Sequence, residues 1–542
     1  MLYVIINCSL FLFQASSDQD DSINAMKVIV FLSSLLQLFA ICRVVGCGSC
    51  VESGNIKVTH NGAMIKVKAL CNNHHETEWE SSPCVGTGRK SIAIINILLA
   101  AYCLLNGLHV KQMLEFFGHL RLFCFGKSFY YNLQRSVMER VVWFSWLINQ
   151  KSEIENSRAF KNEGYKLNAA GDGQYDSPGF TAGFCTYTVQ DLRSNAIIGL
   201  YVAQKYQVKS SADMEPFACK TILMHLAWDH DLAVDTFTTD RSTTIKSMIE
   251  DLEQSLPDGH PKIEHRYDPW HFIKNILKDL WKACKLKTCK DLVPWIPSIT
   301  NMLWWSFATS IDNHDLLKEK IESIPEHITN NHSFHKNKEH KACQHPPITG
   351  KRKKKWLKKG ALPVEKVDNA LHGFDNSRLK DLPHMVGFTH TGSIESWNAL
   401  HNHYCSKMYS WSSSAMFTRA ALAAIDYNCN LDRSLARNKD GSLQFDQVCN
   451  RNGNKWFVKT RKEKKDVSFR DVIAKQILEV QINGKIMNSI VGEFFQCVEE
   501  RKRPPVKIPV ADSDQFVRHR LEKPDKAEAF SKHQTRMAKS SN

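Results

Sequence analysis

Residues 165–285 alternate between extended and helical patterns, and this alternation limits the possible fold more than any other feature of the sequence. It predicts strands and helices in the order β-β-β-α-β-α-β-α, with the last helix starting at Pro269. Three strands in a meander, followed by strands added in parallel across helices, form an α/β fold with a mixed sheet. The expected strands are Lys166–Ala170, Ala182–Gln190, Ala196–Ala203, Val234–Thr239 and Ile263–Tyr267, and the expected helices are Glu215–Trp228 and Ser242–Leu256.

This order of elements is that of a ribonuclease-H-like fold, in which the ends of the first and fourth strands lie side by side. Asp172 follows the first strand, Asp240 closes the fourth, and Glu395 lies in a later helix, Ser393–Tyr404. Carboxylates in these places would meet and could hold two Mg²⁺ or Mn²⁺ ions, since Mg²⁺ prefers octahedral oxygen ligands. Two such ions, about 4 Å apart, stabilise the attacking and leaving oxygens of in-line phosphoryl displacement.

Each of these acids also has a purely structural interpretation. Asp172 and Asp176 lie in a Gly- and Pro-rich segment, where Asp is common for backbone reasons. Asp240 precedes a helix and could be its N-cap, and Glu395 could be a solvated helix residue. Asp176 is also a rival for the first catalytic position. The combination of acids at the expected topological positions favours the catalytic interpretation.

The helix after the fifth strand opens with a second cluster, Asp268-Pro269-Trp270-His271. Asp268 as N-cap and Pro269 at the first helical position have a structural explanation. Trp270 and His271 have no such explanation. A histidine in that first turn would pack near the carboxylate site.

The motifs taken together resemble those of the cut-and-paste DDE/D transposases. The resemblance is greatest to the Kolobok-like group, with Mutator-like and hAT elements as more distant relatives, and it covers roughly residues 26–435. The strings that carry it are Gly171-Asp172-Gly173, Asp176-Ser177-Pro178-Gly179, Thr239-Asp240-Arg241, Asp268-Pro269-Trp270-His271, and His390-Thr391-Gly392 with Glu395.

The resemblance implies that Asp172, Asp240 and Glu395 form the catalytic triad. It also implies that Asp268 and His271 are the supporting Asp-x-x-His motif, and that residues 286–385 are an insertion between the second and third acids. The expected activity is metal-dependent cleavage at transposon ends and transfer of the freed 3′-hydroxyl to target DNA. The expected partners are double-stranded DNA and further copies of the chain, and the expected compartment is the nucleus. A domesticated DNA-binding protein that no longer cleaves is the second hypothesis.

Residues 26–84 contain a cysteine cluster with β-like alternation and predict a small zinc module. Cys42-x4-Cys47 followed by Cys71-x2-His74 could make a tetrahedral Zn²⁺ site of the Cys₃His type. Cys50 offers an alternative pair with Cys47, at a more usual spacing. Resembling proteins have paired cysteines after a Leu-Phe step, which favours Cys42 and Cys47. Simple buried thiols are the alternative interpretation.

Residues 85–160 are predicted to be helical. Helix His109–Phe117 ends at Gly118, and Ser128 is a candidate N-cap for the next helix. The pair predicts either a helix-turn-helix that enters a major groove or an ordinary helical hairpin.

A strongly basic run lies inside the insertion, in a chain with 71 Lys and Arg against 56 Asp and Glu and a net charge of +15. Such a run is typical of a nuclear-localisation signal or of contacts to nucleic-acid phosphates, although a solvated loop also fits. An aromatic residue within it would stack on bases. Nearby His332, His335, Cys343 and His345 could ligate a second metal or be free polar loop residues. The run is Lys351, Arg352, Lys353, Lys354, Lys355, Trp356, Leu357, Lys358 and Lys359.

Composition and hydropathy set the remaining limits. Apolar residues make up 43% and charged residues 23%, which excludes a chain disordered throughout and a coiled-coil rod. The odd number of cysteines, 17, spread over 542 residues favours a reducing compartment. Residues 91–110 predict a buried helix rather than a membrane span, so no membrane partner is expected. Residues 1–25 stay unassigned, as a signal or an artefact of gene prediction, and residues 436–542 are expected to be helical and then disordered.

Overall fold

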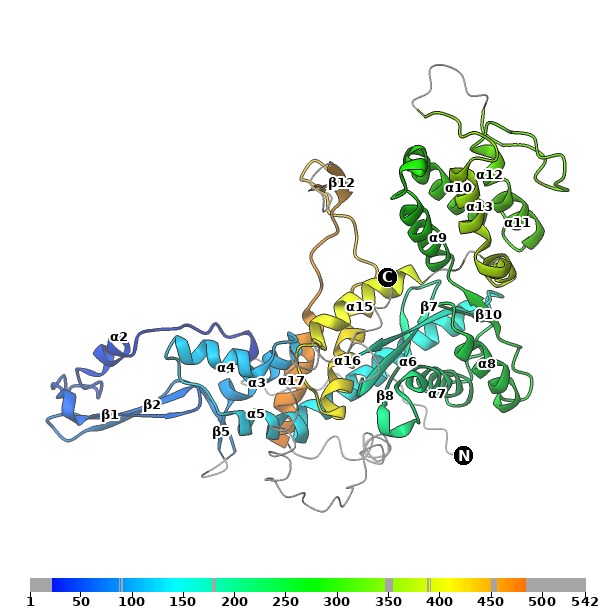
Figure 1. The fold of residues 1–542 in the computed structure, drawn as a ribbon. Coiled ribbons are helices and arrows are strands. Elements are labelled where there is room, and N and C mark those ends of the chain that lie inside the picture. The colour runs from blue at the N-terminus through cyan, green and yellow to red at the C-terminus, as the bar shows by residue number, and fades with distance from the viewer. Residues whose placement is uncertain are drawn as a thin grey trace, which may run out of the picture. The chain divides into compact units, whose positions relative to one another are not determined.

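The computed structural model describes residues 22–86, 88, 91–177, 182–346, 354–387, 389, 391–449 and 456–483. Its largest sheet has five strands in the order β10-β9-β6-β7-β8 (Figure 1). The strands β6, β7 and β8 form an antiparallel meander, and β9 and β10 join parallel to β6. The predicted α/β class with a mixed sheet is confirmed, and each predicted strand overlaps an observed one. The strands are β6 (Asn168–Tyr175), β7 (Phe184–Asp191), β8 (Ile197–Gln204), β9 (Thr236–Thr239) and β10 (Glu264–Tyr267).

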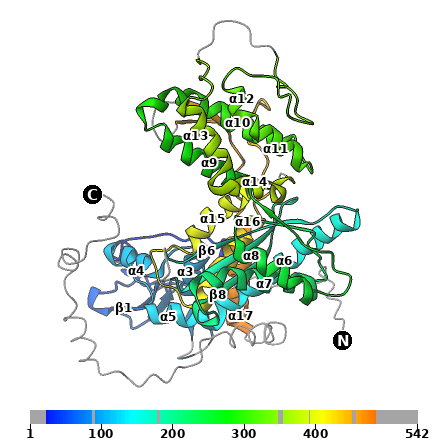
Figure 2. The same ribbon diagram turned by 45° about the vertical axis from the view of Figure 1, so that its right-hand side comes forward.

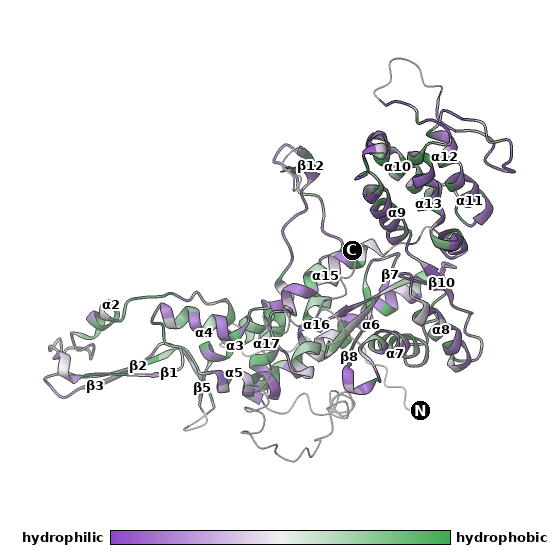
Figure 3. Ribbon diagram, viewed as in Figure 1, coloured by the Kyte–Doolittle hydropathy of each residue, from purple (hydrophilic) through white to green (hydrophobic). Residues whose placement is uncertain are grey.

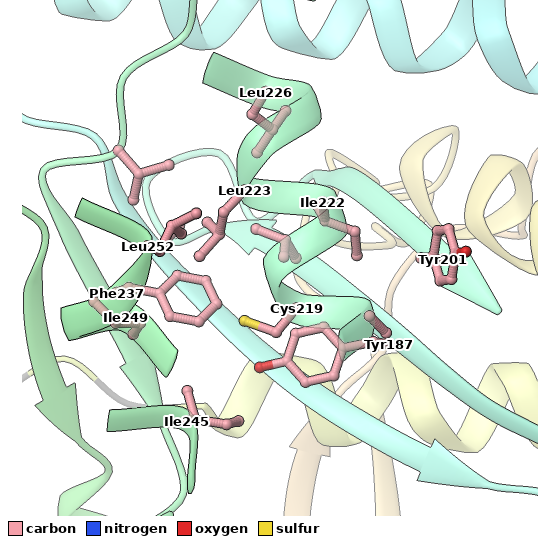
Figure 4. Close-up of a cluster of buried hydrophobic side chains, with 14 of the residues drawn as sticks. Tyr187, Tyr201, Cys219, Ile222, Leu223, Leu226, Phe237, Ile245, Ile249 and Leu252 are labelled. Carbon is pink, nitrogen blue, oxygen red and sulfur yellow. The ribbon is translucent and has the colours of Figure 1, made fainter. Parts of the chain in front are cut away.

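Helices α7 (Met214–Trp228) and α8 (Thr243–Leu252) cover one face of this sheet (Figure 4). Their apolar side chains, including Cys219 and Ile249, pack against Tyr187 of β7 and Phe237 of β9. The strand β6 approaches this layer closely, because a Cβ at Gly171 would lie 2.5 Å from both Phe237 and Tyr187 side-chain atoms. A glycine is therefore required one residue before Asp172.

Two long helices, α6 (Glu139–Asn162) and α16 (Ser413–Asn428), also pack against β8. Gln150 of α6 donates to the backbone oxygen of Ile198 at 2.9 Å, and Asn428 of α16 accepts the amide of Ile197 at 2.8 Å. Helix α15 (Gly392–Tyr404) contacts β6 and lies beside it in Figure 2. Segments from far along the chain therefore complete the surroundings of the first strand.

The helices between β10 and α15 pack around a second hydrophobic core, which also includes Tyr267 of β10. Their residues alternate between hydrophobic and hydrophilic in Figure 3, which is typical of helices with one buried face. They are α9 (Pro269–Ala283), α10 (Ile296–Ala308), α11 (His314–Glu322), α12 (Ile324–His327), α13 (Leu362–His372) and α14 (Ser377–Lys380).

The amino-terminal segment contains a three-stranded antiparallel sheet of β1 (Ile56–Asn61), β2 (Met64–Leu70) and β3 (Glu76–Glu80). Three helices follow it: α3 (Ile94–Leu105), α4 (Val110–His119) and α5 (Lys127–Leu133). Helix α5 begins after Gly126, so Ser128 is not the N-cap that the sequence predicts. Within the described ranges, no helix combines the length and the apolar character needed to cross a bilayer.

The carboxyl-terminal part differs from the sequence prediction. A two-stranded sheet of β11 (Phe445–Cys449) and β12 (Trp456–Thr460) precedes the helix α17 (Ser468–Asn483), where only helix was expected. Residues 484–542 lie outside the described part, and so does the disordered tail predicted there.

Candidate active site and metal clusters

Asp172 lies within β6, which is longer than the sequence predicts, at the point where its parallel pairing with β9 has ended, and Asp240 directly follows β9. Ala170 of β6 pairs with Thr238 of β9, and each acid comes two residues further along the chain. Neighbouring strands are about 4.8 Å apart, so the register alone brings the two acids close together. Burial, and then the charge of Asp240, raise the pKa of Asp172. Ser242 is the N-cap of α8, which removes the structural explanation for Asp240.

His271 lies between Asp240 and Asp268. Its Nδ1 is 2.8 Å from Oδ1 of Asp240 and 2.9 Å from Oδ2 of Asp268. Burial alone would lower the pKa of His271, but its hydrogen bonds to the two carboxylates outweigh this effect and raise the pKa to about 9. The imidazole is therefore protonated at neutral pH and joins the two acids.

Asp268 is buried and is held from several directions. It caps α9 by accepting the amide of Trp270 at 2.9 Å, and Thr391 donates to its Oδ2 at 2.7 Å. Burial would raise the pKa of Asp268, but the hydrogen bonds from His271, Thr391 and the Trp270 amide lower it. Asp268 is thus an ionised and fixed partner for His271.

Glu395 lies in the first turn of α15 and is exposed. Three residues later, on the same side of the helix, the Asn398 amide donates to Oδ2 of Asp172 at 2.7 Å. Among the described residues, the acidic group with ligand atoms within 4.8 Å of one another contains Asp240, Asp268 and His271. The structure therefore brings Asp268 and His271 to Asp240. Glu395 lies outside that group, one helical turn from Asn398, which contacts Asp172.

Asp176, the rival first acid, has a backbone role. Its Oδ1 accepts the amides of Gly183 at 3.0 Å and Phe184 at 3.2 Å, which joins the end of β6 to the start of β7. Asp172, whose pKa is raised by burial and then by the charge of Asp240, is therefore the better candidate for the first acid.

Glu215 of α7 is a neighbour of the site that sequence reasoning missed. A Cβ at Gly173 would lie 2.9 Å from Cγ of Glu215, so the absence of a side chain at position 173 admits this carboxyl. Burial, followed by the charges of Asp172 and Asp240, raises the pKa of Glu215 to about 7. Tyr175 donates to Glu215 Oε2 at 3.5 Å. The sequence offered one signal for such a neighbour: Asp172 has a glycine on each side, and a glycine leaves room for another side chain.

Three cysteines and a histidine form a separate cluster at the amino-terminal end of the described chain, in agreement with three of the four predicted ligands. The members are Cys42, Cys47, Cys71 and His75. Nδ1 of His75 lies 3.8 Å from Sγ of Cys42 and 3.7 Å from Sγ of Cys71. The Sγ atoms of Cys47 and Cys71 are 4.0 Å apart. Ligand atoms around tetrahedral Zn²⁺ are about 3.4–3.8 Å apart, so the arrangement could hold zinc.

The prediction of His74 as the fourth member was wrong. His74 is exposed and has a φ of 59°, and the turn that this left-handed residue makes directs the next residue, His75, to the cysteines. Cys50, the alternative ligand, is exposed and lies outside the cluster.

The basic run is described only in part, because Lys351, Arg352 and Lys353 lie outside the described residues. Trp356 is half-buried, with its ring centroid 5.3 Å from that of Trp295, so it packs against the insertion's own core. The lysines at 355, 358 and 359 are exposed, and Lys354 donates to the Ser298 hydroxyl.

Comparison of the chain with protein-family models, with curated proteins and with solved structures finds no match.

Proposed function

We propose that the chain is a transposase-like enzyme with a ribonuclease-H-like core, which cleaves DNA phosphodiester bonds with the help of divalent cations. The observation that carries the proposal is that Asp172 and Asp240 each lie two residues beyond the last parallel pair of β6 and β9, Ala170 with Thr238. The order β10-β9-β6-β7-β8, with an antiparallel meander and two parallel additions, supports the choice of core.

The donor set fits hard divalent cations. Burial, and then the negative charges of Asp172 and Asp240, raise the pKa of Glu215 to about 7, so the three carboxylates repel one another. A cation would relieve this repulsion, and carboxylate oxygens are the ligands that Mg²⁺ and Mn²⁺ prefer. When bound, the ions would supply charge stabilisation at the attacking and leaving oxygens of the phosphate.

The remaining side chains orient the acids. Asn398 fixes one oxygen of Asp172, and His271, itself fixed by Asp268, holds one oxygen of Asp240. Glu395 projects from the helix that carries Asn398, and we assign it as the third acid of the triad. A partner as large as DNA suits a chain with a net charge of +15, and it implies action in the nucleus.

The proposal is tested with the full-length protein and supercoiled plasmid DNA, with Mn²⁺ or Mg²⁺ present or removed. We expect metal-dependent nicking that falls at least a hundredfold in Asp172→Asn and in Asp240→Asn. Asp251→Asn, an exposed acid on α8, is the matched control and should nick as the parent does. Nicking that survives in both active-site variants overturns the proposal.

A second candidate function is that of a DNA-binding protein on the same core that no longer cleaves. It is favoured by one observation, namely that the group around Asp240 contains His271 and Asp268 and leaves out Glu395. In that case the plasmid would be retained by the protein without nicking under either metal. Glu395→Gln separates the two candidates, because it reduces cleavage only where Glu395 is catalytic.

The Cys₃His cluster is assigned as a zinc site with a structural role. Four protein ligands close the tetrahedron and leave no position for a substrate. The module it would hold begins just before a three-stranded sheet with an alternating basic and acidic surface, where Lys66 and Lys68 pair with Glu78. This zinc module, with the helices α4 and α5, is proposed to recognise the ends of the DNA element.

A further inference from the structure

We propose that the helical insertion contains a second zinc site, formed by His327, His332, Cys343 and His345. One potential ligand atom from each residue lies within 4.8 Å of every other, and the four residues belong to the insertion alone. The inference is independent of any cleavage activity.

The geometry of the side chains is that of a closed metal centre. Nδ1 of His327 lies 3.1 Å from Sγ of Cys343. The ring centroids of His327, His332 and His345 are 4.9 Å, 5.3 Å and 5.1 Å from one another, in the three pairs. Each pair of rings meets edge to face, at 86° to 90°, so three imidazoles converge without stacking.

Two of the histidines already have the second hydrogen bond that metal ligands usually make. Nδ1 of His345 donates to the backbone oxygen of Pro346 at 2.8 Å, which directs Nε2 elsewhere. Nε2 of His332 lies 3.3 Å from Oδ1 of Asn330, which can accept a hydrogen bond from it. A histidine ligand typically donates its other ring nitrogen to a carbonyl or carboxyl oxygen, and this contact fixes the ring orientation and tautomer.

The chemistry of the four ligands selects zinc. One thiolate with three imidazoles is a borderline-soft set, unsuited to Mg²⁺ or Ca²⁺ and suited to Zn²⁺. With four protein ligands, the centre would be structural and would have no open position for a reaction.

The proposed zinc site would hold together a loop, residues 328–346, that has little regular structure of its own. Residues 328–346 contain no helix or strand, and only one isolated bridge, Ser333 with Ala342, is formed there. The middle of this loop is held by Glu319 of α11, which accepts the amides of Lys338, Glu339 and His340 at 2.8–2.9 Å.

The four proposed ligands lie where the two ends of this loop meet, beside the end of α12. The amide of Cys343 donates to the backbone oxygen of His332 at 3.0 Å, which places these two ligands opposite each other. His327 is the last residue of α12, so it is the one ligand of the four that belongs to a helix. The ring of Trp356 lies 5.3 Å from that of His332, so a metal here would also order the start of the described basic run.

The first test is the zinc content of the full-length protein, purified without chelators. We expect two zinc ions per chain, one from each cluster of cysteine and histidine. His345→Ala and Cys343→Ser should each lose one, whereas His335→Ala, an exposed histidine of the same loop, should lose none. His345→Cys restores a ligand and should retain both ions. Equal zinc in the parent, His345→Ala and Cys343→Ser overturns the proposal.

A second measurement keeps the result clear if one variant folds poorly. In Cys71→Ser protein, which lacks a ligand of the other cluster, a chelator should speed tryptic cleavage at Lys336 and Lys341 of the loop. In the double variant with His345→Ala, cleavage should be fast from the start and insensitive to the chelator. A chelator that leaves cleavage of the Cys71→Ser protein unchanged contradicts a metal in the loop.

Discussion

The side-chain amide of Asn398 donates to Oδ2 of Asp172 over 2.7 Å, and this bond joins residues that are 226 positions apart in the chain. Asp172 is otherwise bonded through its Oδ1, which accepts the amide of Gly173 at 2.9 Å. Both carboxylate oxygens are therefore oriented before any ligand arrives. The late helix α15 contributes to the candidate site through this asparagine as well as through Glu395.

Substitution Asn398→Ala should weaken Mn²⁺ binding and plasmid nicking by about 10–100-fold, which is typical for the loss of a group that orients a metal ligand. The effect should appear in metal affinity, measured by calorimetric titration. Ser396→Ala, an exposed neighbour on the same helix, should change neither quantity. Equal affinities in the parent and Asn398→Ala would show that the bond does not orient the acid.

The adjacent histidines of the amino-terminal cluster form a matched pair of variants. His75→Ala should lose one zinc ion per chain, because His75 lies 3.7–3.8 Å from two cysteine sulfurs. His74→Ala should keep the zinc, because His74 is not a member of the cluster. The measurement is zinc content after gel filtration, and retention in His75→Ala would exclude this residue as a ligand.

The free energy of unfolding should fall as the pH is lowered from about 6.5 towards 4. Burial lowers the pKa of His401 to about 3, and that of His230 and of His265 to about 4. Between these values and the ordinary pKa of about 6.5, the unfolded chain binds protons that the folded chain does not, so this contribution to stability is complete above the window and is lost as the pH falls through it. Each histidine contributes a slope of at most about 1.4 kcal/mol per pH unit.

Urea unfolding at several pH values checks this expectation. Carboxylates also titrate in this range, so the informative comparison is with His401→Gln, whose amide can still donate to Gln174 as the His401 ring does. The variant should show a shallower pH dependence than the parent. Parallel curves would contradict a depressed pKa for His401.

Arg470→Met should destabilise the chain by roughly 3 kcal/mol, because it removes a partner from a buried charge. Asp426 is 1% exposed and is bonded by Arg470 at 3.2 Å, Lys465 at 3.3 Å and Tyr404 at 2.8 Å. The double variant with Asp426→Asn should recover part of the loss, since no charge is then left buried. Thermal and urea unfolding measure the stability of both variants. An Arg470→Met protein as stable as the parent would show that Arg470 does not stabilise the buried charge of Asp426.

Much of the central sheet could be predicted from the sequence, because alternating apolar residues and turn signals mark strands such as Ala196–Ala203 clearly. The meeting of Asp172 and Asp240 followed from strand order, which is a property of the chain's topology. Contacts that depend on side-chain direction could not be foreseen. His75 lies in the metal cluster in place of His74 because His74 has a left-handed φ of 59°. Glu215 reaches the candidate site because Gly173 has no side chain to exclude it.

The two strands after residue 436 were missed for a related reason. Phe445–Cys449 and Trp456–Thr460 pair only with each other, and most of their residues are exposed or half-buried. Strands without a buried face lack the apolar alternation on which the sequence interpretation rests.

The hydrogen bond from Thr391 to Asp268 spans 123 positions, and Thr238 donates to Thr389 at 2.7 Å beside it. The chain thus leaves for the insertion and returns from it at one place. Side-chain hydrogen bonds therefore tie both ends of the helical segment to each other and to the sheet. Because Asp268 also bonds His271, a shift of the bundle against the sheet would change the surroundings of Asp240 directly.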